Sequence, residues 1–279
     1  MPGSNVPSER TPLVSSNLSR GTYAPAGPTD TRGPCPLVNC LANHGYINRT
    51  GRDIRASDLN TAMNVVGLSA ALGAVFAFPI YNERLDRNVA KLDRRRGFLA
   101  RLWYLLRNPW SIMSNFGLRR RKQVDGQGTK VLNLDQLATP GIIEHDVSLT
   151  RRDHTQKPGN IAPQSELVED LLASSSDGKT ITMADLAALR KRRIQRQLDE
   201  NPDLQYGALA HQIACTEIAL ILDVFGNGSS VPCDYARAVF KEERLPVREG
   251  WTRRYWWTLG FYELVGTMNK VKSLVGLQV

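Results

Sequence analysis

Residues 59–81 constrain the fold of this chain more than any other segment. No side chain from Leu59 to Tyr81 carries a charge. A run of this length suits either a buried core helix or a helix that crosses a bilayer. The run also contains asparagine and glycine residues, which favour a packed protein interior over lipid. We therefore expect one core helix over residues 57–78 and keep a membrane span as the alternative.

The remaining patterns favour helices. Thr182 followed by Asp185 is an acidic variant of the capping box and marks a helix start. Pro36 suits the first position of a helix and Gly45 the residue after its end. Strand-like alternation is nearly absent, so we predict a mostly α protein with one domain and no internal repeats. The other expected helices cover residues 36–43, 132–138, 165–173, 204–225, 235–242 and 256–265.

The positive charge is concentrated in one segment. The chain has a net charge of +9, and residues 83–122 alone hold twelve basic and three acidic side chains. Basic ends around an aromatic and aliphatic middle are typical of helices at membrane surfaces. Contact with an anionic membrane through residues 94–122 is therefore one interpretation, and a surface insertion over residues 83–130 is the other. We expect no nucleic-acid binding, because no known binding motif accompanies the charge.

The first 31 residues are rich in Pro, Ser, Gly and Thr and lack the apolar core of a signal peptide. We expect a disordered leader over residues 1–31, a folded domain over 32–265 and a tail over 266–279. Without a classical secretion signal, the expected location is intracellular and cytoplasmic, with possible membrane association. Disulfides are then not expected among the four cysteines.

Cys35 is the first candidate for chemistry. It lies between Pro34 and Pro36, and Pro36 begins the predicted helix. The free N–H groups of the first helical turn would then point at the sulfur and stabilise a thiolate. Such a thiolate can bind haem iron. Taken alone, a cysteine between two prolines is equally a plain loop residue.

Two acidic sites follow. Glu144, His145 and Asp146 stand in a row with Ser148 close behind, a pattern that suits a hard cation or an oriented imidazole, and equally an exposed polar turn. Glu217 is flanked at helical spacing by apolar residues. Burial there would raise its pKa toward the range of a general acid–base, unless a structural partner satisfies it.

Together these sites resemble one family, the fungal haem-thiolate peroxidases that include chloroperoxidase and the unspecific peroxygenases. The resemblance is strongest at Arg32–Ile47, and it resumes at Gly51–Ile54, at Glu144–Asp153, around Glu217 and at Glu243–Trp251. Longer members of the family carry an arginine seven residues before the glutamate and a glycine at the histidine position. Here those positions hold Ala210 and His145, as in the shorter, chloroperoxidase-like branch.

The resemblance implies a role for each matching residue. Cys35, with Pro34 and Pro36 beside it, looks like the axial ligand of haem b. Glu217 looks like the acid–base that handles hydrogen peroxide, with His145 positioning it and Asp146 holding His145. Glu144, the backbone of His145 and Ser148 look like ligands of a Mg²⁺ or Mn²⁺ ion near a haem propionate.

The implied activity is peroxide-dependent oxidation of small organic substrates. Hydroxylation, epoxidation and one-electron oxidation of aromatic or secondary-metabolite compounds all belong to this chemistry. Two alternatives remain open at this point. One is a haloperoxidase, and the other is a non-catalytic haem-binding or membrane-surface protein in a biosynthetic assembly.

Overall fold

The structure, a computed structural model, describes residues 18–84, 116–254 and 256–276. In this part of the chain most residues of regular structure are helical. The α-helices are α1 (Pro36–Asn43), α2 (Ala56–Val65), α3 (Ala70–Ala77), α7 (Ser165–Ala173), α8 (Met183–Glu200), α9 (Ala208–Leu220), α10 (Cys233–Phe240) and α11 (Phe261–Val275). Shorter turns are the 3-10 helices η2 (Pro79–Tyr81), η3 (Leu134–Ala138) and η5 (Pro246–Glu249), and the π-helical turn η4 (Ile221–Phe225). The prediction of a mostly α fold is confirmed.

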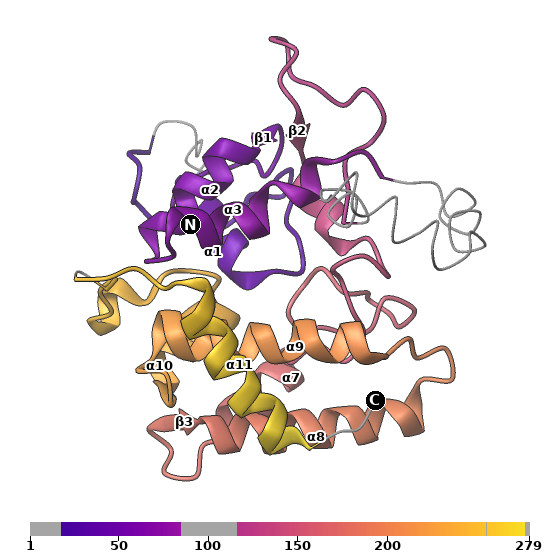
Figure 1. Cartoon of the computed structure of the whole chain (residues 1–279), viewed down its shortest axis with the longest axis vertical. Coiled ribbons are helices and arrows are strands. Elements are labelled where there is room, and N and C mark those ends of the chain that lie inside the picture. Colours follow the sequence, from indigo (N-terminus) through magenta and orange to yellow (C-terminus); the bar gives the residue numbers. More distant parts are fainter. Residues whose placement is uncertain (1–17, 85–115, 255, 277–279) are drawn as a thin grey trace, which may run out of the picture.

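The helices form two groups, one above the other in Figure 1. The upper group contains α1, α2 and α3. In the lower group α11 packs across both α8 and α9, and α7 lies beside α8 and α10. The long irregular segment between η3 and α7 connects the two groups and carries the Glu144–His145–Asp146 sequence.

The single helix expected over residues 57–78 is wrong. The chain forms α2 and α3, separated by Gly67, which has a φ of 96°. Ser69 then caps α3 by accepting a hydrogen bond from the Leu72 amide. Leu259 holds the break open, because its backbone bonds both Gly67 and Ser69. With the helix interrupted here, the alternative of a membrane span over residues 59–81 loses its basis.

Two small antiparallel sheets join distant segments. Strand β1 (Ile54–Arg55) pairs with β2 (Val131–Leu132), and β3 (Thr180–Thr182) pairs with β4 (Ser230–Pro232). The first pairing brings Leu134 against Gly33, where an added Cβ would lie 2.4 Å from the Leu134 carbonyl oxygen. A glycine is therefore needed at position 33, two residues before Cys35.

The expectation that order begins near Arg32 is wrong for the part of the leader that the structure describes. Residues 18–31 form turns and irregular backbone bonded to the domain. Gly21 and Ala24 donate their amides to the carbonyls of His44 and Asn43. The guanidinium of Arg49 bonds the carbonyls of Ser19 and Thr22. Residues 1–17 of the expected leader lie outside the described residues.

Several helix ends follow local signals and others do not. Helices α1 and α7 have the expected bounds, and α8 begins at the Thr182–Asp185 capping box. The long helix expected over residues 204–225 begins at Ala208 and ends in the η4 turn. At the C-terminus the helix begins at Phe261, not at residue 256, and extends to Val275 through most of the expected tail.

The basic segment lies mainly outside the described residues, which include only its two ends. These ends pair with each other, because Arg84 donates to the Arg119 carbonyl and Arg119 donates to the Asn82 carbonyl. The buried Arg119 guanidinium also contacts Glu83 at 2.9 Å. The two ends of the segment are thus joined to each other and to the domain.

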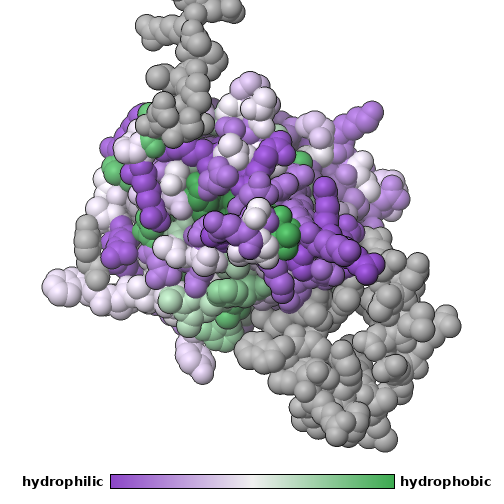
Figure 2. Space-filling view, turned by 90° about the horizontal axis from the view of Figure 1, so that it is seen from above, coloured by the Kyte–Doolittle hydropathy of each residue, from purple (hydrophilic) through white to green (hydrophobic). Residues whose placement is uncertain are grey.

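One helical stretch of the described residues, Ala208–Phe225, is long and apolar enough to cross a membrane, but half of it is buried against other helices. That burial is typical of a core helix. Most of the surface seen in Figure 2 is hydrophilic, with an apolar area at its lower edge. Trp256 and Tyr262 are the most exposed large aromatic side chains described, at 92% and 90%.

Candidate functional site

Cys35 is the residue before the first turn of α1. Its backbone is extended, with φ −79° and ψ 110°, and Pro36 occupies the first helical turn. The amides of Leu37 and Val38 donate hydrogen bonds to its sulfur. Burial nevertheless raises the pKa of the thiol to about 11, and the Glu217 carboxylate acts in the same direction. The sulfur therefore lies within electrostatic reach of Glu217, and burial favours its protonated form.

A buried hydrogen-bond network holds the segment before Cys35. Asn39 exchanges two hydrogen bonds with the backbone of Gly33 and donates a third to Glu243 at 2.8 Å. The same Glu243 oxygen accepts a hydrogen bond from Arg151 at 2.8 Å. Arg151 is only 1% exposed. The loop that presents the sulfur is therefore fixed from behind by a buried ion pair.

Glu217 and His145 meet although they are 72 positions apart in the chain. Glu217 lies on α9, and its Oε2 is 3.3 Å from Nε2 of His145, which is buried. The two atoms have the spacing of an ion pair without the alignment of a full hydrogen bond. The Glu217 side chain is 52% exposed although burial is the largest influence on its pKa.

The expectation of a raised pKa for Glu217 is wrong in this structure. Burial would raise that pKa, but the adjacent His145 outweighs burial and lowers it. For His145 the direction is opposite: burial opposes the charged form, and Glu217 more than compensates, so its pKa is raised. The two side chains behave as a coupled carboxylate–imidazolium pair.

Asp146 contacts His145 through its backbone carbonyl and not through its carboxylate. Nδ1 of His145 bonds the backbone carbonyl of Asp146 at 2.8 Å. The carboxylate turns the other way, because it accepts hydrogen bonds from the His154 ring at 2.9 Å and from the Gln205 amide at 2.9 Å. A left-handed backbone at Val147, with φ 65°, accompanies this turn of the chain. Asp146 thus belongs to a second histidine pair.

Glu144 is a buried carboxyl with a raised pKa of about 8, caused chiefly by its burial and opposed by His145. It accepts a hydrogen bond from Asn160. The carbonyl of Ser148 accepts hydrogen bonds from Arg193. Among the described residues no group of three or more His, Cys, Asp or Glu side chains has the arrangement of a metal site. The ion site expected from the sequence therefore has one carboxylate, that of Glu144. Its other expected ligands are the His145 carbonyl and the Ser148 hydroxyl.

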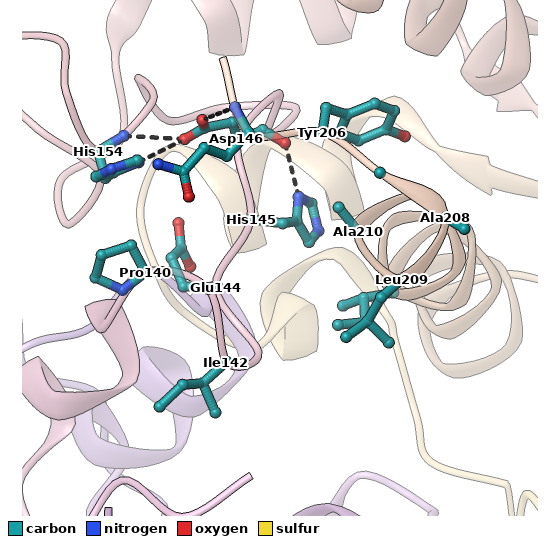
Figure 3. A pocket seen from close by; sticks show the side chains of 14 residues that line it. Pro140, Ile142, Glu144, His145, Asp146, His154, Tyr206, Ala208, Leu209 and Ala210 are labelled. Atoms are coloured by element: carbon teal, nitrogen blue, oxygen red, sulfur yellow. Dashed lines mark hydrogen bonds and ion pairs between the residues drawn. The ribbon is translucent and has the colours of Figure 1, made fainter. Parts of the chain in front are cut away.

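A cavity of about 520 Å³ has His145, but not Glu217, among the residues of its wall. Figure 3 shows Glu144 and His145 on one side and Leu209 and Ala210 of α9 on the other, with Asp146 and His154 at the far end. The wall residues are Pro140, Gly141, Ile142, Glu144, His145, Asp146, His154, Gln205, Tyr206, Gly207, Ala208, Leu209, Ala210 and Ile213. The lining is mainly apolar, and none of the described residues in it is Lys or Arg.

Sequence reasoning missed several residues of this site. Arg151, Glu243 and Asn39 support the cysteine loop, and His154 lies beside Asp146. Arg151, Asn39 and Glu243 all fall within segments that carry the family resemblance, which was the available signal. Nothing in the local pattern around His154 singled it out.

Comparison with known proteins shows the family of this chain. The model of "Peroxidase, family 2" matches residues 21–255. The chain belongs to this family. It is 30% identical over 141 residues to a chloroperoxidase of Leptoxyphium fumago, a match that covers 50% of this chain and 28% of that protein. It is 24% identical over 233 residues to an aromatic peroxygenase of Cyclocybe aegerita, covering 80% of this chain and 56% of that protein.

A third relative is the dothistromin biosynthesis peroxidase of Dothistroma septosporum, 26% identical over 218 residues, with 78% of this chain and 47% of that protein covered. For the chloroperoxidase and the aromatic peroxygenase, the chain spans only 28% and 56% of the length. The activity of the whole protein is therefore a matter of proposal.

Proposed function

We propose that this protein is a haem-thiolate peroxidase or peroxygenase that uses hydrogen peroxide to oxidise small organic compounds. The observation that carries the proposal is the relation between Cys35 and Glu217. A sulfur that accepts amide hydrogen bonds at a helix start lies within electrostatic reach of a carboxyl paired with a histidine. The names of the relatives, which include an aromatic peroxygenase and a biosynthesis peroxidase, support aromatic or secondary-metabolite substrates.

The residues fit a haem b group. A thiol whose pKa is raised by burial becomes a ligand once a metal cation replaces its proton, and the amides of Leu37 and Val38 then stabilise the thiolate. Gly33, closely packed against Leu134, and the Asn39–Glu243–Arg151 network fix the position of the sulfur. When bound, the haem supplies the redox centre at which peroxide is reduced and an organic substrate is oxidised.

The Glu217–His145 pair would supply proton transfer beside the haem. Glu217 as a carboxylate would take the proton from one oxygen of hydrogen peroxide and return it to the other. His145 holds Glu217 in the ionised form from which this cycle starts, because it lowers the pKa of that carboxyl. The carbonyl of Asp146 fixes the imidazole of His145 in turn.

A Mg²⁺ or Mn²⁺ ion beside Glu144 is a second part of the proposal. A buried carboxyl with a pKa of about 8 is stabilised as a carboxylate when a divalent cation lies next to it. Glu144, the His145 carbonyl and Ser148 would offer the oxygen ligands that such ions prefer. The ion would hold a haem propionate at this side of the site.

Contact with an anionic membrane through residues 94–122 is a further proposal. The basic side chains of this segment are its main support. The exposed Trp256 and Tyr262 are of the residue types that gather at membrane interfaces.

The experiment that tests the proposed function is the absorption spectrum of the haem-loaded protein, reduced under carbon monoxide. A Soret band shifted far to the red that is lost in Cys35→Ala supports a thiolate ligand. Cys233→Ala, which changes another buried cysteine, is the matched control and should keep the shifted band. A spectrum that is the same in the Cys35 variant would refute the proposal.

A further inference from the structure

Helix α8 carries a run of basic residues to which the proposed function gives no role. Five of the seven residues at positions 190–196 are Arg or Lys. Some of them line a second cavity, of about 380 Å³, which α8 forms with the neighbouring α7 (Figure 1). Among the described residues its wall consists of Asp170, Ala173, Leu189, Arg192, Arg193 and Arg196.

The wall of this cavity has an excess of positive charge. Three guanidinium groups and one carboxylate, that of Asp170, give it a net charge of +2. Asp170 contacts Arg196 at 3.8 Å, and Arg196 also contacts Glu200 at 2.9 Å. Arg192 is exposed, and no carboxylate of the described residues forms an ion pair with it. The carboxylates of the protein therefore neutralise Arg196 and leave Arg192 available.

Arg193 is the buried member of the group. The residue is 2% exposed, and its Nε and Nη2 both donate to the carbonyl of Ser148 at 3.3 Å. Its third nitrogen, Nη1, is buried and has no acceptor among the described residues. Burial lowers the pKa of Arg193, Asp153 opposes this shift, and neighbouring arginines add to it. A buried guanidinium among other cations is stabilised by an anion that brings oxygen acceptors.

The chemistry and size of the cavity define the class of ligand. Guanidinium groups match the oxygen atoms of a phosphate group in both charge and geometry. A net charge of +2 in the wall complements a dianion. The volume lies in the range of small-molecule sites, so there is room for more than the phosphate itself. Leu189 and Ala173 present apolar surface beside the arginines.

We propose that the cavity between α7 and α8 binds a dianionic phosphate group, with Arg192 and Arg193 as its principal donors. The group belongs either to inorganic phosphate or to a small phosphate ester whose carbon chain contacts Leu189 and Ala173. This inference goes beyond the proposed function and does not depend on it, because no residue of the wall belongs to the proposed haem or peroxide site.

The test is isothermal titration calorimetry of the purified protein at constant ionic strength and about pH 8, where a phosphate group is a dianion. The probes are inorganic phosphate and n-butyl phosphate. In Arg192→Gln both should bind about 10-fold more weakly, since a hydrogen bond between charged groups is lost. Arg192 is exposed, so this substitution leaves the packing of α8 intact.

Two further variants make the result specific. Lys191→Gln removes an exposed positive charge from the adjacent position of α8, outside the cavity wall, and should leave the affinity unchanged. Asp170→Asn removes the carboxylate that competes for Arg196, so both probes should bind about 3-fold tighter. Circular dichroism of each variant checks that the helices are retained.

Equal losses of affinity in Arg192→Gln and Lys191→Gln would overturn the proposal, because overall charge would then attract the anion. A wild-type protein that binds neither probe at millimolar concentration would also overturn it. Tighter binding of n-butyl phosphate than of inorganic phosphate supports an ester, and equal binding supports the free anion. These measurements need no haem, so they are separate from the spectrum that tests the proposed function.

Discussion

At the scale of single residues, the pairing of Glu217 with His145 decides how the proposed site handles protons. The Glu217→Gln variant keeps the shape of the side chain but cannot take up a proton. We expect peroxide-dependent turnover to fall about 10²-fold or more, since general acid–base catalysis contributes factors of that size. The Soret band of the haem-loaded variant should remain. Turnover of a phenolic reporter by stopped-flow absorption is the measurement.

The matched control for that variant is Glu166→Gln, which changes an exposed glutamate on α7 that bonds Arg152. Its turnover should equal that of the wild type. Normal turnover in Glu217→Gln would show that another group moves the proton. A lost Soret band would instead indicate a damaged haem site.

Asp223 provides a residue-scale prediction about pH. This side chain is 2% exposed in the η4 turn, accepts a hydrogen bond from Thr267, and has a second oxygen without a described partner. Burial raises its pKa to about 6, and nearby Glu263 adds to the shift. The folded state therefore favours the protonated form. Its contribution to stability is fully present below about pH 4, is lost as the pH rises through 6, and stays lost above it.

The Asp223→Asn variant should remove this dependence. Between about pH 4 and 7 the wild type should lose up to about 3 kcal/mol of unfolding free energy that the variant retains. Urea unfolding of both proteins, followed by circular dichroism at several pH values, measures the difference. Parallel pH curves for the two proteins would contradict the assignment.

At the scale of elements, the network behind Cys35 ties α1 to two distant segments. Arg151 and Glu243 form a buried pair, with 1% and 15% side-chain exposure. Removal of one partner leaves a buried charge without compensation, so Arg151→Met should lower the unfolding free energy by about 3–5 kcal/mol. Arg152→Met is the control, because its pair with Glu166 is more exposed and should be worth less than about 1 kcal/mol.

A double variant separates the contribution of the ion pair to stability from the contribution of the packed arginine side chain. Arg151→Met combined with Glu243→Gln removes both charges, and we expect part of the lost stability to return. Denaturant titration of the four proteins gives the coupling free energy. Purely additive losses would mean that the two side chains act independently.

Elements with strong local signals could be predicted from the sequence, and those set by distant contacts could not. Pro36 and the Thr182–Asp185 box fixed the starts of α1 and α8, because capping depends on neighbours within one turn. The break between α2 and α3 depends on Leu259, which lies far along the chain. The ordered segment 18–31 likewise depends on Arg49 and His44, which its own composition does not reveal.

The same division applies to the candidate site. The motifs identified Cys35 and Glu217, but the pKa of Glu217 depends on a histidine brought to it by the fold. Asp146 was predicted to hold His145, and in the structure its backbone carbonyl bonds the His145 ring. The sequence did not reveal that the Asp146 carboxylate is directed at His154, beside the left-handed turn at Val147.

At the scale of the whole molecule, the concentrated positive charge leads to a prediction about membranes. Residues 94–96 are three consecutive arginines in the segment outside the described residues, and the remainder of the chain beyond 83–122 is neutral overall. Each basic residue near an anionic bilayer contributes about 1 kcal/mol. Replacement of Arg94, Arg95 and Arg96 by Gln should therefore weaken binding to phosphatidylserine-containing vesicles by about 100-fold, as measured by flotation.

The informative control is a second triple variant with the same net charge as the first. Its three positive charges are removed from another part of the surface. Lys179, Lys191 and Arg192 are exposed on the lower helical group, and their replacement by Gln removes three positive charges there. If the basic segment forms the contact, this control should float almost as well as the wild type, and neither protein should bind vesicles of phosphatidylcholine alone. Equal losses in the two triple variants would mean that only overall charge attracts the protein to lipid. Because long-range attraction of that kind is screened by salt, such binding would also disappear in both variants as the salt concentration rises toward physiological values.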